Sequence, residues 1–187
     1  MIIGFAGLAG AGKNEAARAL PFHQIGFADD IKEIVISIDP IISFHPVSGL
    51  IHLSELLKYE SFELVKRNSP ELRKILQEMG MTMRERNDEF WVDQVWSKIS
   101  QRQLNDDFCI TDVRFLNEIS FIKREFMKPG FVIWIERPGV KQTPHASENS
   151  ISALDCDGFV LNDGTVEELH EKVRAEVEML YQDWTER

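Results

Sequence analysis

A glycine-rich segment near the N-terminus constrains the fold more than any other part of the sequence. It reads Gly7-Leu8-Ala9-Gly10-Ala11-Gly12-Lys13-Asn14, with two glycines separated by four residues and followed by a lysine. This matches the phosphate-binding loop pattern except at its last position. An apolar run, Ile2 to Ala6, precedes it, and helix-forming residues, Glu15 to Leu20, follow it. A strand, loop and helix in this order indicate a phosphate-binding loop, rather than a glycine-rich turn that only links a strand to a helix.

The residue types of this loop suit phosphate chemistry. Gly10, Ala11 and Gly12 let backbone N–H groups approach phosphate oxygens, because no large side chain stands in the way. Lys13 would bring a positive charge to the β- and γ-phosphates of a nucleotide. Asn14 stands where a magnesium-ligating hydroxyl is usual, and its amide oxygen could bind Mg²⁺ directly or through a retained water.

Short apolar runs alternate with amphipathic stretches along the chain, which is typical of βα units and predicts an α/β fold. Five runs have the length of buried strands: Ile2–Ala6, Ile25–Ala28, Phe108–Thr111, Phe131–Ile135 and Gly158–Leu161. Predicted helices lie between and after these strands, and the last helix is the clearest. Its apolar residues recur at helical spacing: Leu169, Val173, Val177 and Leu180.

Two stretches interrupt the βα rhythm. Prolines and a glycine surround a helical segment near Leu53 to Val65, and we interpret residues 37–102 as an inserted helical lobe within one domain, 1–187. Residues 137–149 form a second irregular stretch, with two prolines and a glycine. A long loop of this kind, beside a site, is typical of a lid.

Charge and composition exclude several functions. The chain has 21 basic and 31 acidic residues, a net charge of −10, so DNA or RNA would be repelled by its overall field. No apolar run is long enough to span a membrane. Two cysteines, Cys109 and Cys156, are too few for a disulfide framework, which favours a reducing cytoplasmic location.

Asp112 ends an apolar strand, the place where phosphate-loop proteins hold a magnesium-organising aspartate, and Arg114 follows two residues later. Strands often end in aspartate for reasons of turn chemistry alone. The phosphate-binding loop earlier in the chain favours the functional interpretation. Asn14 and Asp112 are therefore the candidate Mg²⁺ ligands.

Several further segments, in their order, carry a resemblance to a known family. They are the loop with asparagine after its lysine, Phe27-Ala28-Asp29 with Lys32, Arg73 with Leu76-Gln77, Ile110 to Phe115 with Asn117-Glu118, Ile135 to Pro138, His145 to Asn149 and Asn162 to Thr165. Together they resemble the deoxynucleoside monophosphate kinases of bacteriophages, within the adenylate-kinase-like group of phosphate-loop (P-loop) kinases. The resemblance covers nearly the whole chain and is weakest between residues 37 and 70.

The resemblance implies a P-loop NTPase fold, in which helices flank a five-stranded parallel sheet with the loop-bearing strand at its centre. It also implies an inserted nucleotide-monophosphate lobe and a lid that carries an arginine. The implied substrates are ATP, with Mg²⁺, and a deoxynucleoside monophosphate. The enzyme would act in the host cytoplasm, in deoxynucleotide biosynthesis.

By this resemblance, each predicted site residue has a role. Arg114 would bridge the phosphates and Arg137 would come from the lid, with Lys13 and Asp112 completing the catalytic group. The lid would also include His145, Ser147 and Glu148. The adenine contacts would be Asn162, Asp163, Gly164 and Thr165. The monophosphate would be bound by Asp29, Lys32, Arg73, Gln77 and one of Arg84 and Arg86, a choice that the sequence leaves open.

The chemistry agrees with this assignment. A phosphate acceptor is already anionic near neutral pH, since its second pKa is about 6, so no general base is required. Arginine, lysine and magnesium suit the task of holding two polyanions together. The alternatives are another small-molecule P-loop kinase, such as a dephospho-coenzyme A kinase, or a nucleotide-sensing switch. The sequence leaves open which bases are accepted, whether ribose is rejected, and whether the chain forms a homodimer.

Overall fold

The computed structural model describes residues 1–47, 49–102, 106–124, 128–141 and 150–187. The chain divides into two compact units. Unit 1 comprises Met1–Phe27 and Val92–Arg187, and unit 2 comprises Ala28–Trp91. The insertion predicted at residues 37–102 thus overlaps unit 2.

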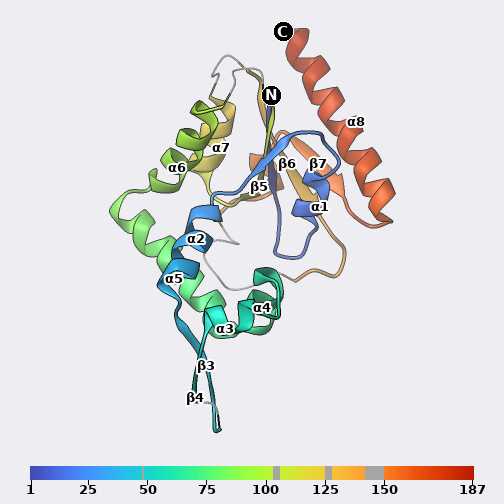
Figure 1. The fold of residues 1–187 in the computed structure, drawn as a ribbon. Helices are drawn as coiled ribbons and strands as arrows, with labels where there is room; N and C mark the ends of the chain where they lie inside the picture. Colours follow the sequence, from blue (N-terminus) through green and yellow to red (C-terminus); the bar gives the residue numbers. More distant parts are fainter. Residues whose placement is uncertain (48, 103–105, 125–127, 142–149) are drawn as a thin grey trace. The chain divides into compact units, whose positions relative to one another are not determined.

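A five-stranded parallel sheet forms the centre of unit 1 (Figure 1). Its strands are β1 (Ile2–Ala6), β2 (His23–Ile25), β5 (Phe108–Val113), β6 (Gly130–Glu136) and β7 (Gly158–Leu161). The spatial order is β2-β5-β1-β6-β7, and every neighbouring pair is parallel. This confirms the predicted five-stranded α/β fold, with the loop-bearing strand β1 in the middle.

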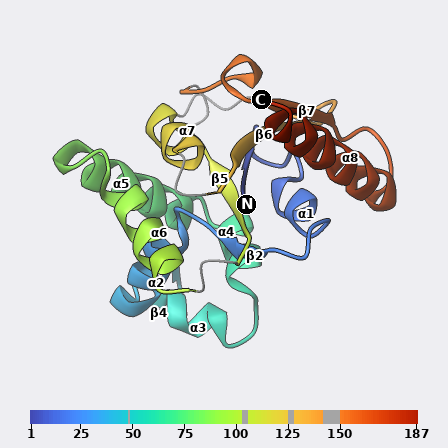
Figure 2. The same ribbon diagram turned by 90° about the horizontal axis from the view of Figure 1, so that it is seen from above.

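Helices cover both faces of this sheet, α7 on one side and α1 and α8 on the other (Figure 2). The helices of unit 1 are α1 (Lys13–Ala17), α7 (Leu116–Lys123), α8 (Val166–Thr185) and the greater part of α6 (Phe90–Ser100). Because successive strand residues point to opposite faces, Ile3 and Phe5 of β1 belong to the core beneath α1 and α8. The four predicted apolar residues of α8 are all buried in that core.

The second strand differs from the prediction in both place and burial. It spans His23–Ile25 rather than residues 25–28, and two of its three residues are exposed. β2 is an edge strand, so one flank has no neighbour to bury it. Phe27 lies beyond the strand, where its backbone N–H donates to Asp112 Oδ1 at 2.8 Å. Ala28 is already the N-cap of the next helix.

Unit 2 combines helices with a two-stranded antiparallel hairpin that projects from them (Figure 1). Its elements are α2 (Asp29–Ile38), β3 (Ile41–His45), β4 (Gly49–His52), α3 (Leu53–Leu57), α4 (Phe62–Asn68) and α5 (Pro70–Arg86). α5 packs against α2 and α4. Ser61 and Ser69 cap α4 and α5 by accepting hydrogen bonds from backbone N–H groups of the first helical turn.

The helical segment predicted near residues 53–65 consists of two short helices, α3 and α4. Ser61 begins a new helix, because its hydroxyl satisfies the Leu64 N–H. The hairpin was not predicted. Gly49, at φ +79, begins β4, and glycine adopts this backbone conformation without the steric penalty that side chains incur.

The sequence also predicts that the chain has no membrane span and no disulfide framework. Among the described helices, none has both the length and the apolar character needed to cross a membrane. Cys109 and Cys156 are both free thiols. Burial raises the pKa of each to about 12.

Gly130 tests how tightly α7 packs against the sheet. Gly130 begins β6, against which α7 packs. A Cβ atom at Gly130 would lie 1.8 Å from the backbone oxygen of Ile122, in the last turn of α7. We expect Gly130→Ala to lower the free energy of unfolding by about 2 kcal/mol or more, because a backbone oxygen cannot rotate away. Thermal or urea unfolding measures the change.

Gly80→Ala is the matched control. There the added methyl group would meet only the flexible end of Ile31, at 3.3 Å, and alanine favours the helix in which Gly80 lies. Its stability should change by less than about 1 kcal/mol. Equal destabilisation by both substitutions would show that Gly130 is not held against α7.

Candidate functional site

The glycine-rich loop between β1 and α1 has the backbone geometry that only glycine adopts readily. Gly7, Gly10 and Gly12 have φ values of +135°, +85° and +102°. Within the loop, the Ala11 N–H donates to the Leu8 carbonyl at 3.1 Å. The chain therefore turns sharply between β1 and α1, as the sequence pattern predicts.

Two of these glycines also allow close approach to neighbouring segments. A Cβ atom on Gly7 would lie 2.2 Å from the carbonyl oxygen of Ile135 in β6. A Cβ atom on Gly12 would lie 2.5 Å from the side-chain nitrogen of Asn162, just after β7. The loop is thus held between β6 and the segment that follows β7.

Lys13, the first residue of α1, turns its side chain back over the loop. Its ammonium group donates to the carbonyl oxygens of Gly7, at 2.7 Å, and Leu8, at 2.9 Å. Only 8% of Lys13 is exposed, which is unusual for a lysine. A partly desolvated cation at a glycine-rich loop attracts anions more strongly than a surface lysine does.

The strand register brings the other predicted donor-site residues to the same edge of the sheet. Ala6, the end of β1, pairs with Val113 of β5 and with Trp134 of β6. Glu136 of β6 pairs with Leu161 of β7. Segments after the carboxyl ends of parallel strands form the usual binding edge of open α/β sheets. The residues gathered there are those of the glycine-rich loop, Asp112, Arg114, Arg137 and Asn162.

Partly buried hydrogen bonds hold the side chain of Asp112 and the backbone of Arg114. Asp112 Oδ1 accepts the Phe27 N–H described above. Glu118, only 1% exposed, accepts from the Arg114 N–H at 2.6 Å and from the Phe115 N–H at 3.1 Å. Glu118 thus orients the turn that carries Arg114, a role the sequence prediction did not assign. The signal for it was a glutamate in the first turn of a helix, three residues after the N-cap.

Asn162 joins three segments of the site. Its side-chain amide donates to the Ala11 carbonyl at 2.8 Å, and its backbone N–H donates to the Glu136 carbonyl at 2.7 Å. The sequence prediction places Asn162 at the adenine. The structure gives its amide another partner, the glycine-rich loop itself.

The next three residues connect β7 to α8. Asp163 accepts a hydrogen bond from Lys172 at 2.6 Å, and this contact lowers the pKa of the Asp163 carboxyl. Thr165 is the N-cap of α8, and its hydroxyl accepts from the Glu168 N–H at 3.2 Å. A Cβ atom on Gly164 would lie 1.8 Å from Glu168 Oε2, so the Glu168 carboxylate, which accepts from the Thr165 N–H at 2.8 Å, would have to move. These contacts fix the backbone of the segment.

A pocket of about 300 Å³ lies beside the glycine-rich loop. Leu8 and Ala11 line it from the loop, and residues 134–140 line it from the end of β6 onward. The exposed Arg137 belongs to this wall. The pocket combines apolar side chains with two charged ones, the cation of Arg137 and the carboxylate of Glu136. Largely apolar walls with a few charged groups are typical of small-molecule sites.

The predicted monophosphate residues all belong to unit 2. Asp29 and Lys32 lie on α2, and the others lie on α5. Arg73, Gln77 and Arg84 are separated by whole helical turns, since spacings of four and eleven residues are close to one and three turns. Arg86, thirteen residues after Arg73, lies about half a turn away from that face. The helix therefore groups Arg84, and not Arg86, with Arg73 and Gln77.

Two of these unit 2 side chains also have structural partners. The Arg73 guanidinium donates to the carbonyl oxygens of Lys66, at 2.8 Å, and Arg67, at the end of α4. The Lys32 ammonium lies 4.9 Å from the centre of the Phe62 ring. Arg73 therefore contributes to the packing of α4 against α5, which the sequence did not suggest.

The predicted lid residues His145, Ser147 and Glu148 lie outside the described residues, which stop at Lys141 and resume at Ser150. Among the residues that are described, no group of three or more histidine, cysteine, aspartate or glutamate side chains could hold a metal ion.

The contrast between Gly7 and Gly10 tests whether the loop is held against β6. Both residues have positive φ, so alanine strains the backbone at either position. Only Gly7→Ala adds a clash with the Ile135 carbonyl, whereas a Cβ atom on Gly10 has nothing within 4 Å. We expect Gly7→Ala to lower the free energy of unfolding by about 1–3 kcal/mol more than Gly10→Ala does. Urea unfolding of both variants measures this, and equal losses would contradict it.

Comparisons with known proteins place the chain in a family. The sequence model of deoxynucleotide monophosphate kinases matches residues 29–173, which is most of the chain and does not include the glycine-rich loop. Similar solved structures include shikimate kinase from Aquifex aeolicus (TM-score 0.43, 13% identity, 95% of this chain and 96% of that one). Another is dephospho-CoA kinase from Campylobacter jejuni (TM-score 0.43, 16% identity, 96% of each chain). No curated protein matches the sequence. Because the family model covers most of its residues, the chain belongs to the deoxynucleotide monophosphate kinase family.

Proposed function

We propose that unit 1 binds ATP, that unit 2 binds a deoxynucleoside monophosphate, and that the enzyme transfers the γ-phosphoryl group between them. Membership of the family makes the chain a nucleoside monophosphate kinase. The observation that carries the donor assignment is Lys13, a residue only 8% exposed, whose ammonium group is held over a loop with three positive-φ glycines. This loop lies outside the family match, so it supports the kinase assignment independently.

In this proposal the enzyme neutralises charge and needs no general base. The acceptor phosphate is largely dianionic at neutral pH, since its second pKa is about 6, and can attack directly. The loop residues Gly10, Ala11, Gly12 and Asn14 would surround the phosphates of ATP together with Lys13. Arg114 and Arg137 would offset the charge of the transferring group, as positioned cations do in phosphoryl transfer.

The adenine of ATP would lie along residues 162–165, beside the pocket lined by residues 134–140. Because the side chains of Asn162 and Asp163 already bind Ala11 and Lys172, the contacts to the base would come chiefly from the backbone of this segment.

The donor set suits Mg²⁺. Asn14 is exposed on the first turn of α1, and Asp112 lies at the carboxyl end of β5, so an amide and a carboxylate oxygen are offered. Magnesium is commonly bound by one or two protein oxygens together with nucleotide phosphates and water. When bound, it neutralises charge on the phosphates.

The acceptor would bind in unit 2, at the face of α5 that carries Arg73, Gln77 and Arg84. α2, with Asp29 and Lys32, packs against α5 and belongs to the same proposal. Arginine suits this task because its planar donors match phosphate oxygens in pairs. We further propose that the enzyme supplies deoxynucleotides for bacteriophage DNA synthesis in the host cytoplasm, where its substrates are found.

A product assay tests the class of reaction and the substrate together. With ATP and Mg²⁺, dGMP, dTMP, dCMP, dAMP and their ribose counterparts are supplied singly, and ADP and the nucleoside diphosphate are quantified. We expect equal amounts of both products, at on the order of 1–100 per second for accepted substrates. Lys13→Ala should reduce transfer at least about a hundredfold, because one charge-stabilising group is lost.

Lys123→Ala is the matched control for this variant. Lys123 forms an ion pair with Asp157 at 2.8 Å and has no part in the proposed site. Its activity should equal that of the unmodified protein. Stimulation by dephospho-coenzyme A alone would identify the other small-molecule kinase. Release of ADP and free phosphate without a diphosphate product would favour the nucleotide-sensing switch.

The two arginines near the end of α5 provide a second test. Arg84→Ala should raise the KM for the monophosphate about tenfold or more, because a charged hydrogen bond to phosphate is lost. Arg86→Ala, half a turn away, should change that KM less than about twofold. Steady-state kinetics with varied acceptor and saturating ATP gives both values. The opposite ranking would mean that the acceptor binds another face of α5.

A further inference from the structure

α1 carries Lys13 but cannot hold its own orientation. The helix spans only five residues, Lys13–Ala17, and its N-cap, Gly12, has no side chain to cap it. Helices this short do not persist in water without packing or tertiary hydrogen bonds. The direction of the Lys13 backbone must therefore be set by the elements that contact α1.

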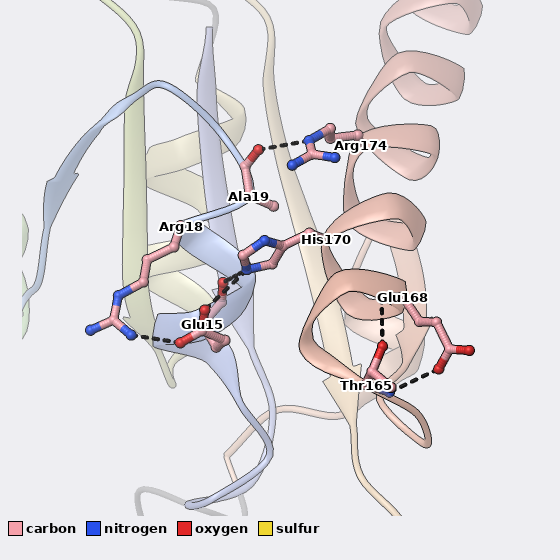
Figure 3. A network of polar contacts seen from close by, with 7 residues as sticks. All are labelled: Glu15, Arg18, Ala19, Thr165, Glu168, His170 and Arg174. Atoms are coloured by element: carbon pink, nitrogen blue, oxygen red, sulfur yellow. Dashed lines mark hydrogen bonds and ion pairs between the residues drawn. The ribbon is translucent and has the colours of Figure 1, made fainter.

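His170 of α8 makes a double contact with α1. Its Nε2 atom lies 3.0 Å from the carbonyl oxygen of Glu15 and 3.1 Å from Glu15 Oε1 (Figure 3). The backbone carbonyl oxygen can only accept a hydrogen bond, so Nε2 must carry the hydrogen. The side chains of His170 and Glu15 are 20% and 28% exposed, which shields the contact from much of the competing water.

A second donor follows one helical turn later. Arg174 Nε donates to the carbonyl oxygen of Ala19, just beyond α1, at 3.0 Å (Figure 3). The other carboxylate oxygen of Glu15 pairs with the exposed Arg18 at 2.6 Å. α8 thus presents two donors to consecutive parts of the loop-bearing segment, and Thr165 fixes where α8 begins.

We propose that His170 is a positioning residue for ATP binding, which holds Glu15 and thereby the orientation of Lys13, two residues earlier. The inference rests on the proposed function of the glycine-rich loop as the ATP phosphate site. His170 acts through α1 and not by touching the nucleotide. Its loss lets α1 shift, so the loop N–H groups and Lys13 no longer converge on the phosphates.

The test compares His170→Ala with His170→Gln. Glutamine places an N–H donor near the position of Nε2, so it can keep the contact that alanine removes. We expect His170→Ala to raise the KM for ATP, and the Kd for ATP measured by calorimetry without acceptor, about tenfold. The KM for the monophosphate should stay within about twofold, and His170→Gln should restore most of the ATP affinity.

Three results would overturn the proposal. One is an unchanged KM and Kd for ATP in His170→Ala. Another is an equal rise in the KM values of both substrates, which would indicate a disturbance of the whole enzyme, or a fall in kcat alone, which would indicate loss of folded protein. The third is an alanine effect that glutamine does not reverse, because a direct contact of the imidazole with ATP would then explain it.

Glu15→Gln keeps the test decisive if His170→Ala folds poorly. The amide oxygen of glutamine still accepts from Nε2, so this variant should retain ATP affinity, whereas Glu15→Ala should lose part of it. Lys123→Ala, which removes a polar contact elsewhere in unit 1, should leave both KM values unchanged.

Lys13→Ala separates the two proposals. If it leaves ATP binding and transfer intact, the proposed function fails, and if it abolishes transfer while His170→Ala is neutral, only the inference about His170 fails.

Discussion

The position of the glycine-rich loop between two strand ends is the constraint on which the rest of the site depends. Gly7 lies so close to the Ile135 carbonyl that any side chain would collide with it. On the other side, Asn162 binds both the Ala11 carbonyl and the Glu136 carbonyl. The loop, the start of the Arg137 segment and the segment after β7 therefore share one framework of backbone contacts. A displacement of any one of them would move the others.

The chain has a net charge of −10, yet its proposed substrates are polyanions. Long-range attraction cannot bring them in, so binding must depend on local cations placed where solvent screening is weak. Lys13 meets this condition through burial, and Glu118 contributes indirectly, since this buried carboxylate fixes the turn that carries Arg114. Acidic residues on the surface thus coexist with a site for phosphates, because the two act over different distances.

The sequence predicts the features that depend on local pattern. The loop follows from its glycine spacing, the central sheet from apolar runs, and the core face of α8 from residues repeated at helical spacing. It fails where long-range pairing decides. The pairing of β2 with β5 ends at Ile25, and two residues later the Phe27 N–H donates to the Asp112 carboxylate. No local sequence pattern reveals these long-range partners. The side-chain partner of Asn162 is likewise 151 residues away in the sequence.

Helical geometry separates two candidate residues that residue type alone leaves equal. Arg84 and Arg86 carry the same charge at nearly the same place in the chain, so composition cannot rank them. Because α5 continues unbroken from Pro70 to Arg86, the spacing from Arg73 and Gln77 places Arg84 on their face of the helix and Arg86 on another. The same reasoning applies to α8, where His170 and Arg174 are one turn apart and so reach the same neighbouring segment. In a regular helix, sequence spacing therefore determines which side chains share a face. A site for two phosphate-bearing substrates depends on cations that share a face in this way.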